Sequence, residues 1–182
     1  MRKIFVTEFL SLDGVMENPA WTFPYWNDEI AAFKTEETDI SDALLLGRVT
    51  YEGIAASWPK IKAEKDPFAP YMNGVRKYVV SMTLDKVEWN NSVLIEGNLV
   101  EEVNKLKQQD GRDIAVHGSA TLAQTLMEHD LVDSYRLLVY PVVVGKGKRL
   151  FKDGGDLKRL KLVDSKTTST GVAILTYEPE KA

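Results

Sequence analysis

The sequence predicts an α/β fold built on one mostly parallel sheet with an antiparallel edge. Strand-like patterns alternate with helix-like patterns over residues 4–140, which favours parallel strands joined by helical crossovers. Two later strand-like segments, 157–163 and 172–177, are joined by a Ser-, Thr- and Gly-rich turn at 165–171, which is typical of a hairpin. The chain has no internal repeat, low-complexity segment or obvious linker, so we expect residues 1–182 to form a single domain.

The first part of the chain predicts a strand, an aromatic loop and a helix. Residues 4–10 are rich in β-forming side chains. After a segment with loop chemistry, three aromatic residue types crowd into residues 21–26. Such a loop either covers the core or forms the wall of a pocket for a flat ligand, and the sequence leaves both open. Asn27 can cap a helix that runs from about Asp28 to Thr38.

The stretch from Leu44 to Glu52 predicts a buried strand, a tight turn and the start of a helix. The apolar run ends at Gly47, and a helical pattern continues to about Trp58. Such a turn directs free backbone N–H groups and the positive end of the helix dipole at the sheet edge. Arg48 can bind a phosphate through two parallel hydrogen bonds. The unit indicates a site for an anionic nucleotide or, in the simpler alternative, an ordinary turn with a solvated arginine.

The remaining elements continue the alternation. Residues 60–73 are polar and interrupted by prolines, which predicts a surface loop with room for one short helix. Asn98, with Glu101 three residues later, resembles a capping box at a helix start. His117 precedes a second strand–glycine–helix unit, which offers hydroxyls and backbone N–H groups over residues 118–122. The other strands are expected at 78–81, 93–95, 114–116 and 135–140.

Composition restricts the function classes. Hydrophobic residues make up 44% and charged residues 27% of the chain, which is typical of a globular protein. A net charge of −4 disfavours broad nucleic-acid binding, and the absence of cysteine excludes disulfides, thiolate catalysis and cysteine-ligated zinc. The two histidines lack metal-ligand spacing, so we expect no metal site. No apolar run reaches the length of a signal peptide or a membrane span, and we therefore expect a cytoplasmic protein with no membrane partner.

Two strand–glycine–helix units at one sheet edge indicate a dinucleotide site. Ligands of open α/β sheets lie outside the carboxyl ends of the strands, so the turns at Gly47 and Gly118 could hold two phosphates. Ser81 and Met82, after the third strand, are a further candidate segment. The chain contains neither G-x-G-x-x-G nor G-x-x-x-x-G-K-[ST], which excludes the Rossmann fingerprint and the P-loop. The carboxylates near the expected pocket are Glu8, Asp13, Glu17, Asp28 and Glu29.

Residues 46–52, Leu-Gly-Arg-Val-Thr-Tyr-Glu, resemble the strand-to-helix NADPH motif of dihydrofolate reductases, G-R-x-T-[WY]-E. Downstream, the chain looks more like the C-terminal reductase domain of the bifunctional deaminase-reductase of riboflavin biosynthesis. That likeness is carried by Gly118-Ser119 with Leu122, Leu131-Val132-Asp133, Pro141, Gly145-Lys146-Gly147 and Leu150-Phe151. The resemblance covers nearly the whole chain, as in a stand-alone relative of that domain. It implies a three-layer dihydrofolate reductase-like fold with helices on both sheet faces, NADPH as cofactor and a homodimer.

The same resemblance implies roles by position. An acidic residue four positions before the helix phenylalanine is catalytic in dihydrofolate reductases, and here that residue is Glu29, before Phe33. Asp13 matches a loop residue of the riboflavin-type relatives and is the second catalytic candidate. Trp21, Phe33 and Ile54 would contact the substrate. The cofactor-binding residues would be Gly47, Arg48, Val49, Thr50, Ser81, Met82, Gly118, Ser119, Ala120, Thr121 and Leu122, with Arg48 on the 2′-phosphate.

The function implied is an NADPH-dependent reductase that transfers a hydride to a small pteridine- or pyrimidine-like substrate. It would resemble dihydrofolate reductase or 5-amino-6-(5-phosphoribosylamino)uracil reductase. The alternative is a non-catalytic, dimeric NADPH-binding protein that retains the site without turnover. The sequence does not separate the two, because both share the cofactor motifs.

Overall fold

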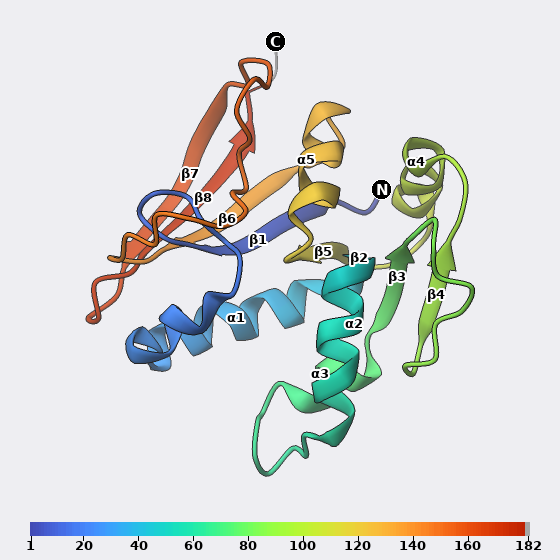
Figure 1. Ribbon diagram of the computed structural model, residues 1–182, viewed down its shortest axis with the longest axis horizontal. Coiled ribbons are helices and arrows are strands. Elements are labelled where there is room, and N and C mark those ends of the chain that lie inside the picture. The colour runs from blue at the N-terminus through green and yellow to red at the C-terminus, as the bar shows by residue number, and fades with distance from the viewer. Residues whose placement is uncertain (181–182) are drawn as a thin grey trace.

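One eight-stranded sheet organises the computed structural model, which describes residues 1–180 (Figure 1). The strand order is β4-β3-β2-β5-β1-β6-β8-β7. Neighbours from β4 to β6 run parallel, and β8 pairs antiparallel with both β6 and β7. The mostly parallel sheet with an antiparallel C-terminal edge is therefore confirmed. The strands are β1 (Ile4–Leu10), β2 (Ser41–Gly47), β3 (Arg76–Val80), β4 (Ser92–Ile95), β5 (Asp113–His117), β6 (Ser134–Val139), β7 (Leu160–Thr167) and β8 (Ala173–Pro179).

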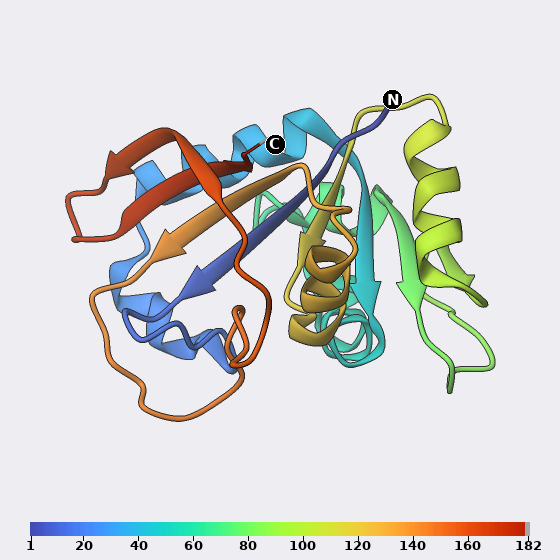
Figure 2. The ribbon, with the colours of Figure 1, turned by 90° about the horizontal axis from the view of Figure 1, so that it is seen from above.

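Helices cover both faces of the sheet, so the structure has three layers (Figures 1 and 2). Alternation along β1 shows how the layers arise, because Ile4 and Val6 pack toward α4 and α5 while Phe5 packs toward α2 and α3. α1 covers β6 and β8 through Ile30 and Phe33, on the same face as α2 and α3. The α-helices are α1 (Asp28–Ile40), α2 (Arg48–Ser57), α3 (Ala69–Gly74), α4 (Leu99–Gln108) and α5 (Ala120–Glu128).

The two predicted helix caps are present. The N–H of Ile30 donates to Asn27 Oδ1 at 3.0 Å at the start of α1, and the N–H of Glu101 donates to Asn98 Oδ1 at 3.1 Å at the start of α4. Each bond satisfies a backbone donor that has no acceptor inside its helix. α3 is the short helix expected in the segment 60–73, preceded by a 3₁₀ turn, η2 (Trp58–Lys60).

The aromatic segment forms a 3₁₀ helix, η1 (Pro19–Tyr25), that covers the core. Trp21 and Tyr25 stand edge-to-face around the buried ring of Tyr140, with ring centroids 5.6 and 5.9 Å away. Phe9 completes the arrangement at 5.8 Å. Of the two possibilities that the sequence left open, these rings therefore close the core over β6.

The terminal hairpin is confirmed, although β7 begins at Leu160 and not at residue 157. The turn closes through the N–H of Thr168, which donates to the carbonyl of Val172 at 2.9 Å. β7 is the last strand of the sheet, and nearly all of its residues are exposed. In the described part of the chain, none of the helices combines the length and apolar character needed to span a bilayer.

Candidate functional site

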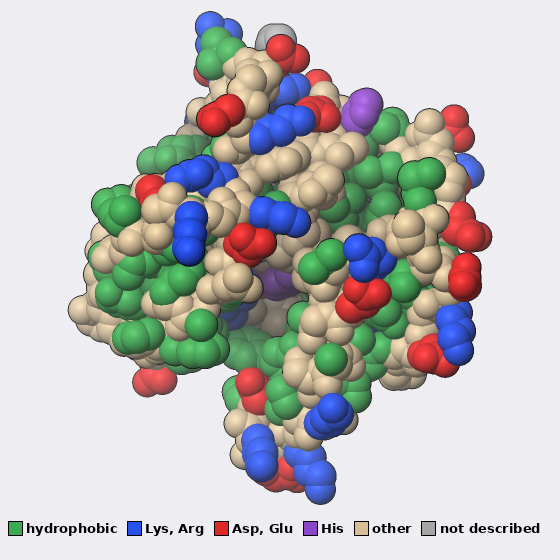
Figure 3. Space-filling model, viewed as in Figure 1, with side chains coloured by type: hydrophobic (Ala, Val, Ile, Leu, Met, Phe, Trp, Pro, Cys, Tyr) green, Lys and Arg blue, Asp and Glu red, His purple; other side chains and the backbone are tan. Residues whose placement is uncertain are grey.

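A cavity of about 610 Å³ opens at the carboxyl ends of β1, β2 and β5. Figure 3 shows this face of the molecule hollowed at its centre, with a histidine side chain inside the hollow. The first turns of α2 and α5 form one wall, and the loop after β1 forms another. The lining residues are Thr7, Glu8, Phe9, Met16, Glu17, Asn18, Pro19, Lys34, Gly47, Arg48, Val49, Thr50, Gly53, Ile54, His117, Gly118, Ser119, Ala120, Thr121, Leu122 and Lys148.

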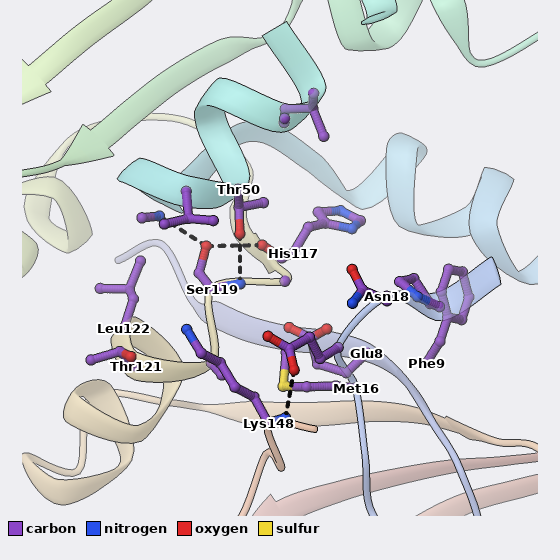
Figure 4. A pocket seen from close by; sticks show the side chains of 18 of the residues that line it. Glu8, Phe9, Met16, Asn18, Thr50, His117, Ser119, Thr121, Leu122 and Lys148 are labelled. Carbon is purple, nitrogen blue, oxygen red and sulfur yellow. Dashed lines mark hydrogen bonds between the residues drawn. The ribbon is translucent and has the colours of Figure 1, made fainter. Parts of the chain in front are cut away.

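The structure brings the two glycine turns together and joins them by hydrogen bonds (Figure 4). The N–H of Gly47 donates to Ser119 Oγ at 2.8 Å, and the N–H of Ser119 donates to Thr50 Oγ1 at 2.8 Å. Ser119 Oγ donates in turn to the carbonyl of His117 at 3.2 Å. The turns form one rigid unit, but these two backbone N–H groups are occupied. The free donors expected at Gly47 and Ser119 are therefore not available to a ligand.

Gly118 is required by this close approach. Its φ of +56° lies in the left-handed region, and a Cβ at this position would lie 2.9 Å from Thr50 Oγ1. A Cβ on Gly47 would lie 3.4 Å from Ser119 Oγ. The missing side chains let the two turns pack against each other beside the cavity.

The helix N-termini remain open to the cavity. Among residues 1–180, no side chain caps the first turn of α2 or α5 by a hydrogen bond. The N–H groups of both first turns lack acceptors within their helices, and the helix dipoles add positive potential. Arg48 stands at the mouth, where it pairs with Glu52 at 3.0 Å and is about half exposed. The arrangement suits an anion such as a phosphate.

Glu8 is buried beside this anion-binding wall, with only 6% of its surface exposed. Its Oε1 has no hydrogen-bond partner among the described residues. Burial raises the pKa of Glu8 well above its ordinary value, although the charge of Lys34 and a hydrogen bond from the Gly118 backbone act in the opposite direction. Figure 4 shows Glu8 pointing into the space that His117 and Lys148 also face.

A network of charges supports this region from α1 and β6. Lys34 Nζ donates to Thr7 Oγ1 at 3.0 Å and pairs with the buried carboxylate of Glu37. Arg136 Nε binds the other oxygen of Glu37 at 3.1 Å. Burial, and then the charge of Lys34, lower the pKa of His117 well below its ordinary value. The imidazole is therefore neutral where it meets the cavity.

Several residues assigned by the resemblance lie elsewhere. Ser81 Oγ accepts the N–H groups of Thr83 and Leu84 at 3.1 and 3.0 Å, and Met82 is 99% exposed. Neither lines the cavity, because the turn after β3 closes on itself. Asp13 accepts the N–H groups of residues 144 and 145 at 3.1 and 2.8 Å and the hydroxyl of Ser11 at 2.6 Å. These bonds lower the pKa of Asp13 to about 2, so it is an ionised loop clamp outside the cavity.

The predicted acid, Glu29, and the predicted substrate contacts Trp21 and Phe33 also lie outside the cavity. Glu29 accepts the N–H and hydroxyl of Ser169, both at 2.8 Å, on the turn between β7 and β8. Phe33 is buried in the core with the Arg136 guanidinium 4.4 Å from its ring centroid, and Trp21 packs on Tyr140. Glu29, Phe33 and Trp21 therefore do not line this cavity. Of the substrate candidates, Ile54 lines the cavity.

The cavity also contains residues that sequence reasoning did not select. The sequence analysis named Glu8 only as one of several carboxylates near the expected pocket. A charged residue near the end of an otherwise apolar strand is unusual, and this pattern could have singled out Glu8. Lys34 and Lys148 offered no such signal, because one lies in a polar helix and the other in a basic loop. His117 is the last residue of β5 and directly precedes the glycine of the second turn. This position in the sequence could have indicated that His117 lies at the edge of the sheet where the cavity opens.

Comparison with known proteins agrees with this architecture. The chain is 33% identical over 179 residues to the uncharacterized protein YyaP of Bacillus subtilis (strain 168), covering 97% of this chain and 94% of that protein. A pyrimidine reductase-like protein from Corynebacterium diphtheriae superposes with a TM-score of 0.69 at 13% identity, covering 100% of this chain and 93% of that one.

A deaminase/5-amino-6-(5-phosphoribosylamino)uracil reductase from Thermotoga maritima superposes with a TM-score of 0.70 at 14% identity. The match covers 98% of this chain but 56% of the longer Thermotoga protein. These structures share the dihydrofolate reductase-like fold with this chain. Residues 2–174 match the RibD C-terminal domain, and the chain therefore belongs to the family of RibD C-terminal domains.

Proposed function

We propose that this protein is an NADPH-dependent reductase that transfers a hydride to a small pteridine- or pyrimidine-like heterocycle or its ribosyl derivative. The observation that carries the proposal is the pair of interlocked glycine turns whose open helix N-termini face one cavity. Membership of a family whose structural relatives include a pyrimidine reductase-like protein supports the reductase assignment. The chain has no cysteine, so a thiolate-dependent reaction is not an alternative to this assignment.

The residues present fit a dinucleotide. The first turns of α2 and α5 would hold its phosphates, and the absence of a Cβ on Gly118 keeps the two turns close enough to act together. Arg48, at the mouth, would bind the additional phosphate that distinguishes NADPH from NADH. When bound, NADPH supplies the hydride. The protein supplies binding and orientation.

The inner end of the cavity suits a flat, polar ring. Phe9, Met16 and Ile54 provide apolar walls, whereas Glu8 and Lys34 provide a small number of polar groups. Ligand sites combine these features, because apolar contact provides affinity and a few polar groups determine orientation. A pyrimidine or pteridine ring offers both an apolar face and hydrogen-bonding edges.

Arg48→Ala should weaken the binding of NADPH about tenfold and leave the binding of NADH nearly unchanged. Only NADPH carries the phosphate that the guanidinium would contact. Fluorescence titration with each nucleotide measures the two dissociation constants. Arg159→Ala, which removes an exposed arginine outside the cavity, is the matched control and should change neither. Equal weakening of both nucleotides by Arg48→Ala would contradict the assignment.

Turnover is tested by following the NADPH absorbance band with a panel that contains dihydrofolate and 5-amino-6-(5-phosphoribosylamino)uracil. Oxidation of NADPH that depends on one of these compounds supports a reductase. Tight NADPH binding without oxidation by any member of the panel would point to the alternative, a binding protein that retains the site. A thermal-shift scan without stabilisation by NADPH would overturn both.

A further inference from the structure

We infer that Glu8, in its neutral acid form at the inner end of the cavity, donates the proton that accompanies hydride transfer to a C=N bond of the substrate. The inference rests on the proposed function. It replaces Glu29 and Asp13, which lie outside the cavity.

Geometry is the first support. Glu8 lies on β1, and its side chain projects into the cavity between the two glycine turns and the loop after β1 (Figure 4). It is 6% exposed, and Oε1 has no partner among residues 1–180. A buried polar atom without a partner costs ~1–3 kcal/mol, and such an atom persists where a ligand completes its hydrogen bonding. Since Glu8 lines the cavity, a substrate group that enters it is the natural partner for this carboxyl.

Charge balance around Glu8 is the second support. Lys34 and Arg136 carry two positive charges, and Glu37 and Glu36 carry two negative charges that pair with them. Both oxygens of Glu37 are used, one by Lys34 and one by Arg136. The cluster is neutral without Glu8, so an ionised Glu8 would give it a net negative charge.

The other groups that face Glu8 do not alter this balance. His117, from β5, is neutral because burial and Lys34 lower its pKa. At the rim, Glu17 Oε2 accepts the backbone N–H of Lys148 at 3.2 Å, and these two residues carry opposite charges. Lys34 and the Gly118 backbone stabilise the ionised form of Glu8, but desolvation is the larger effect on its pKa. Burial thus favours the neutral acid form of Glu8, which is the form that can give a proton.

The proton step balances with hydride transfer. Reduction of a C=N bond forms one C–H bond and one N–H bond. The hydride comes from the dihydronicotinamide, which is oxidised, and the proton leaves the carboxyl group of Glu8 for the nitrogen. The resulting carboxylate takes a proton back from water that enters through the open mouth of the cavity.

The first test is the titration of Glu8 in the wild-type protein without any ligand. Carbon-13 NMR of the side-chain carboxyl, assigned through its own backbone N–H, should show a midpoint well above the ordinary value of 4.5. This measurement needs no variant that could fail to fold. A midpoint at or below 4.5 would overturn the donor role.

The second test compares Glu8→Gln with wild type on the substrate panel. The amide fills the same space but gives no proton, so turnover should fall ~10²-fold or more while the NADPH dissociation constant stays within about twofold. Wild-type turnover should fall with rising pH as Glu8 ionises, and the residual rate of the variant should lack that dependence. Glu178→Gln, an exposed carboxyl on β8, is the matched control and should behave as wild type.

The results separate the two proposals. Normal NADPH binding and turnover with an ordinary Glu8 titration, or with an unaffected Glu8→Gln variant, would overturn the donor role alone. Failure of the wild-type protein to bind NADPH, or to reduce any compound of the panel, would overturn the proposed reductase and the donor role with it.

Discussion

Lys77 is a buried amine in the described structure, with no exposed surface. Its Nζ donates to the carbonyls of Val75 at 2.9 Å and Asn90 at 3.0 Å and lies 4.0 Å from the centroid of the Trp89 ring. Burial nevertheless lowers its pKa to about 8. The amine joins β3 to the segment before β4, and its charge is tolerated and not favoured.

This residue predicts a rise in stability with pH. The unfolded chain binds the Lys77 proton up to about pH 10.5, whereas the folded chain releases it near pH 8, so unfolding takes up a proton between these values. The free energy of unfolding should therefore rise by ~1–3 kcal/mol across that window, measured by urea unfolding. Lys77→Met should lose this rise, and Lys60→Met, at an exposed lysine, should retain it. Parallel pH curves for wild type and Lys77→Met would contradict the prediction.

The carboxylates show the limit of sequence reasoning at the scale of single residues. Helical spacing correctly put Glu29 and Phe33 on neighbouring turns of α1. It did not predict that Phe33 enters the core or that the turn after β7 supplies Ser169 to bind Glu29. Ser169 is 140 residues away in sequence, and such contacts leave no local signature.

The two strand–glycine–helix units are adjacent because β2 and β5 pair in parallel. Leu45 lies opposite Val116 in the register, so both strands end at the same edge and Gly47 meets the turn at Gly118. The sequence predicted each unit and the shared edge, since parallel strands expose their carboxyl ends on one side. It did not predict that the N–H of Ser119 donates a hydrogen bond to Thr50 Oγ1.

Thr50→Val should break this coupling between elements. The variant leaves the N–H of Ser119 without its acceptor, which should lower the free energy of unfolding by ~1–3 kcal/mol. The turn at Ser119 should also shift, which should weaken the binding of NADPH. Urea unfolding and nucleotide titration measure the two effects. Thr50→Ser keeps the hydroxyl and should stay close to wild type. The coupling would be refuted if the valine and serine variants proved equal in both measurements.

At the scale of the whole molecule, exposed apolar side chains lie at the antiparallel end of the sheet. α5 lies over the middle of the sheet (Figure 2). Tyr135, Tyr177 and Leu162 lie opposite one another in the register of β6, β8 and β7, and the row runs from the buried Tyr135 to the exposed Leu162 on the outermost strand. Leu162 is 47% exposed, and Phe151 beside Tyr135 is 49% exposed. Partly covered apolar side chains in a row are typical of an association surface.

We expect this face to form the homodimer that the family resemblance implies. Leu162→Asp places a charge in the row and should shift the protein to monomer in sedimentation-velocity experiments at micromolar concentration. Leu157→Asp changes a leucine that is 81% exposed, outside β7, and should leave the assembly unchanged. A wild-type protein that sediments as a monomer, or a dimer unaffected by Leu162→Asp, would contradict the expectation.

The sequence by itself determined the mostly parallel α/β sheet with its antiparallel edge, the helix caps at Asn27 and Asn98 and the edge at which the glycine turns meet. These features follow from periodicity, caps and turns, which act between near neighbours in the chain. Only the tertiary structure decided that Glu8 faces the cavity, while Glu29 and Asp13 bind loops elsewhere. That choice depends on burial and on contacts across more than a hundred residues, and these arise only when the sheet has brought distant segments together.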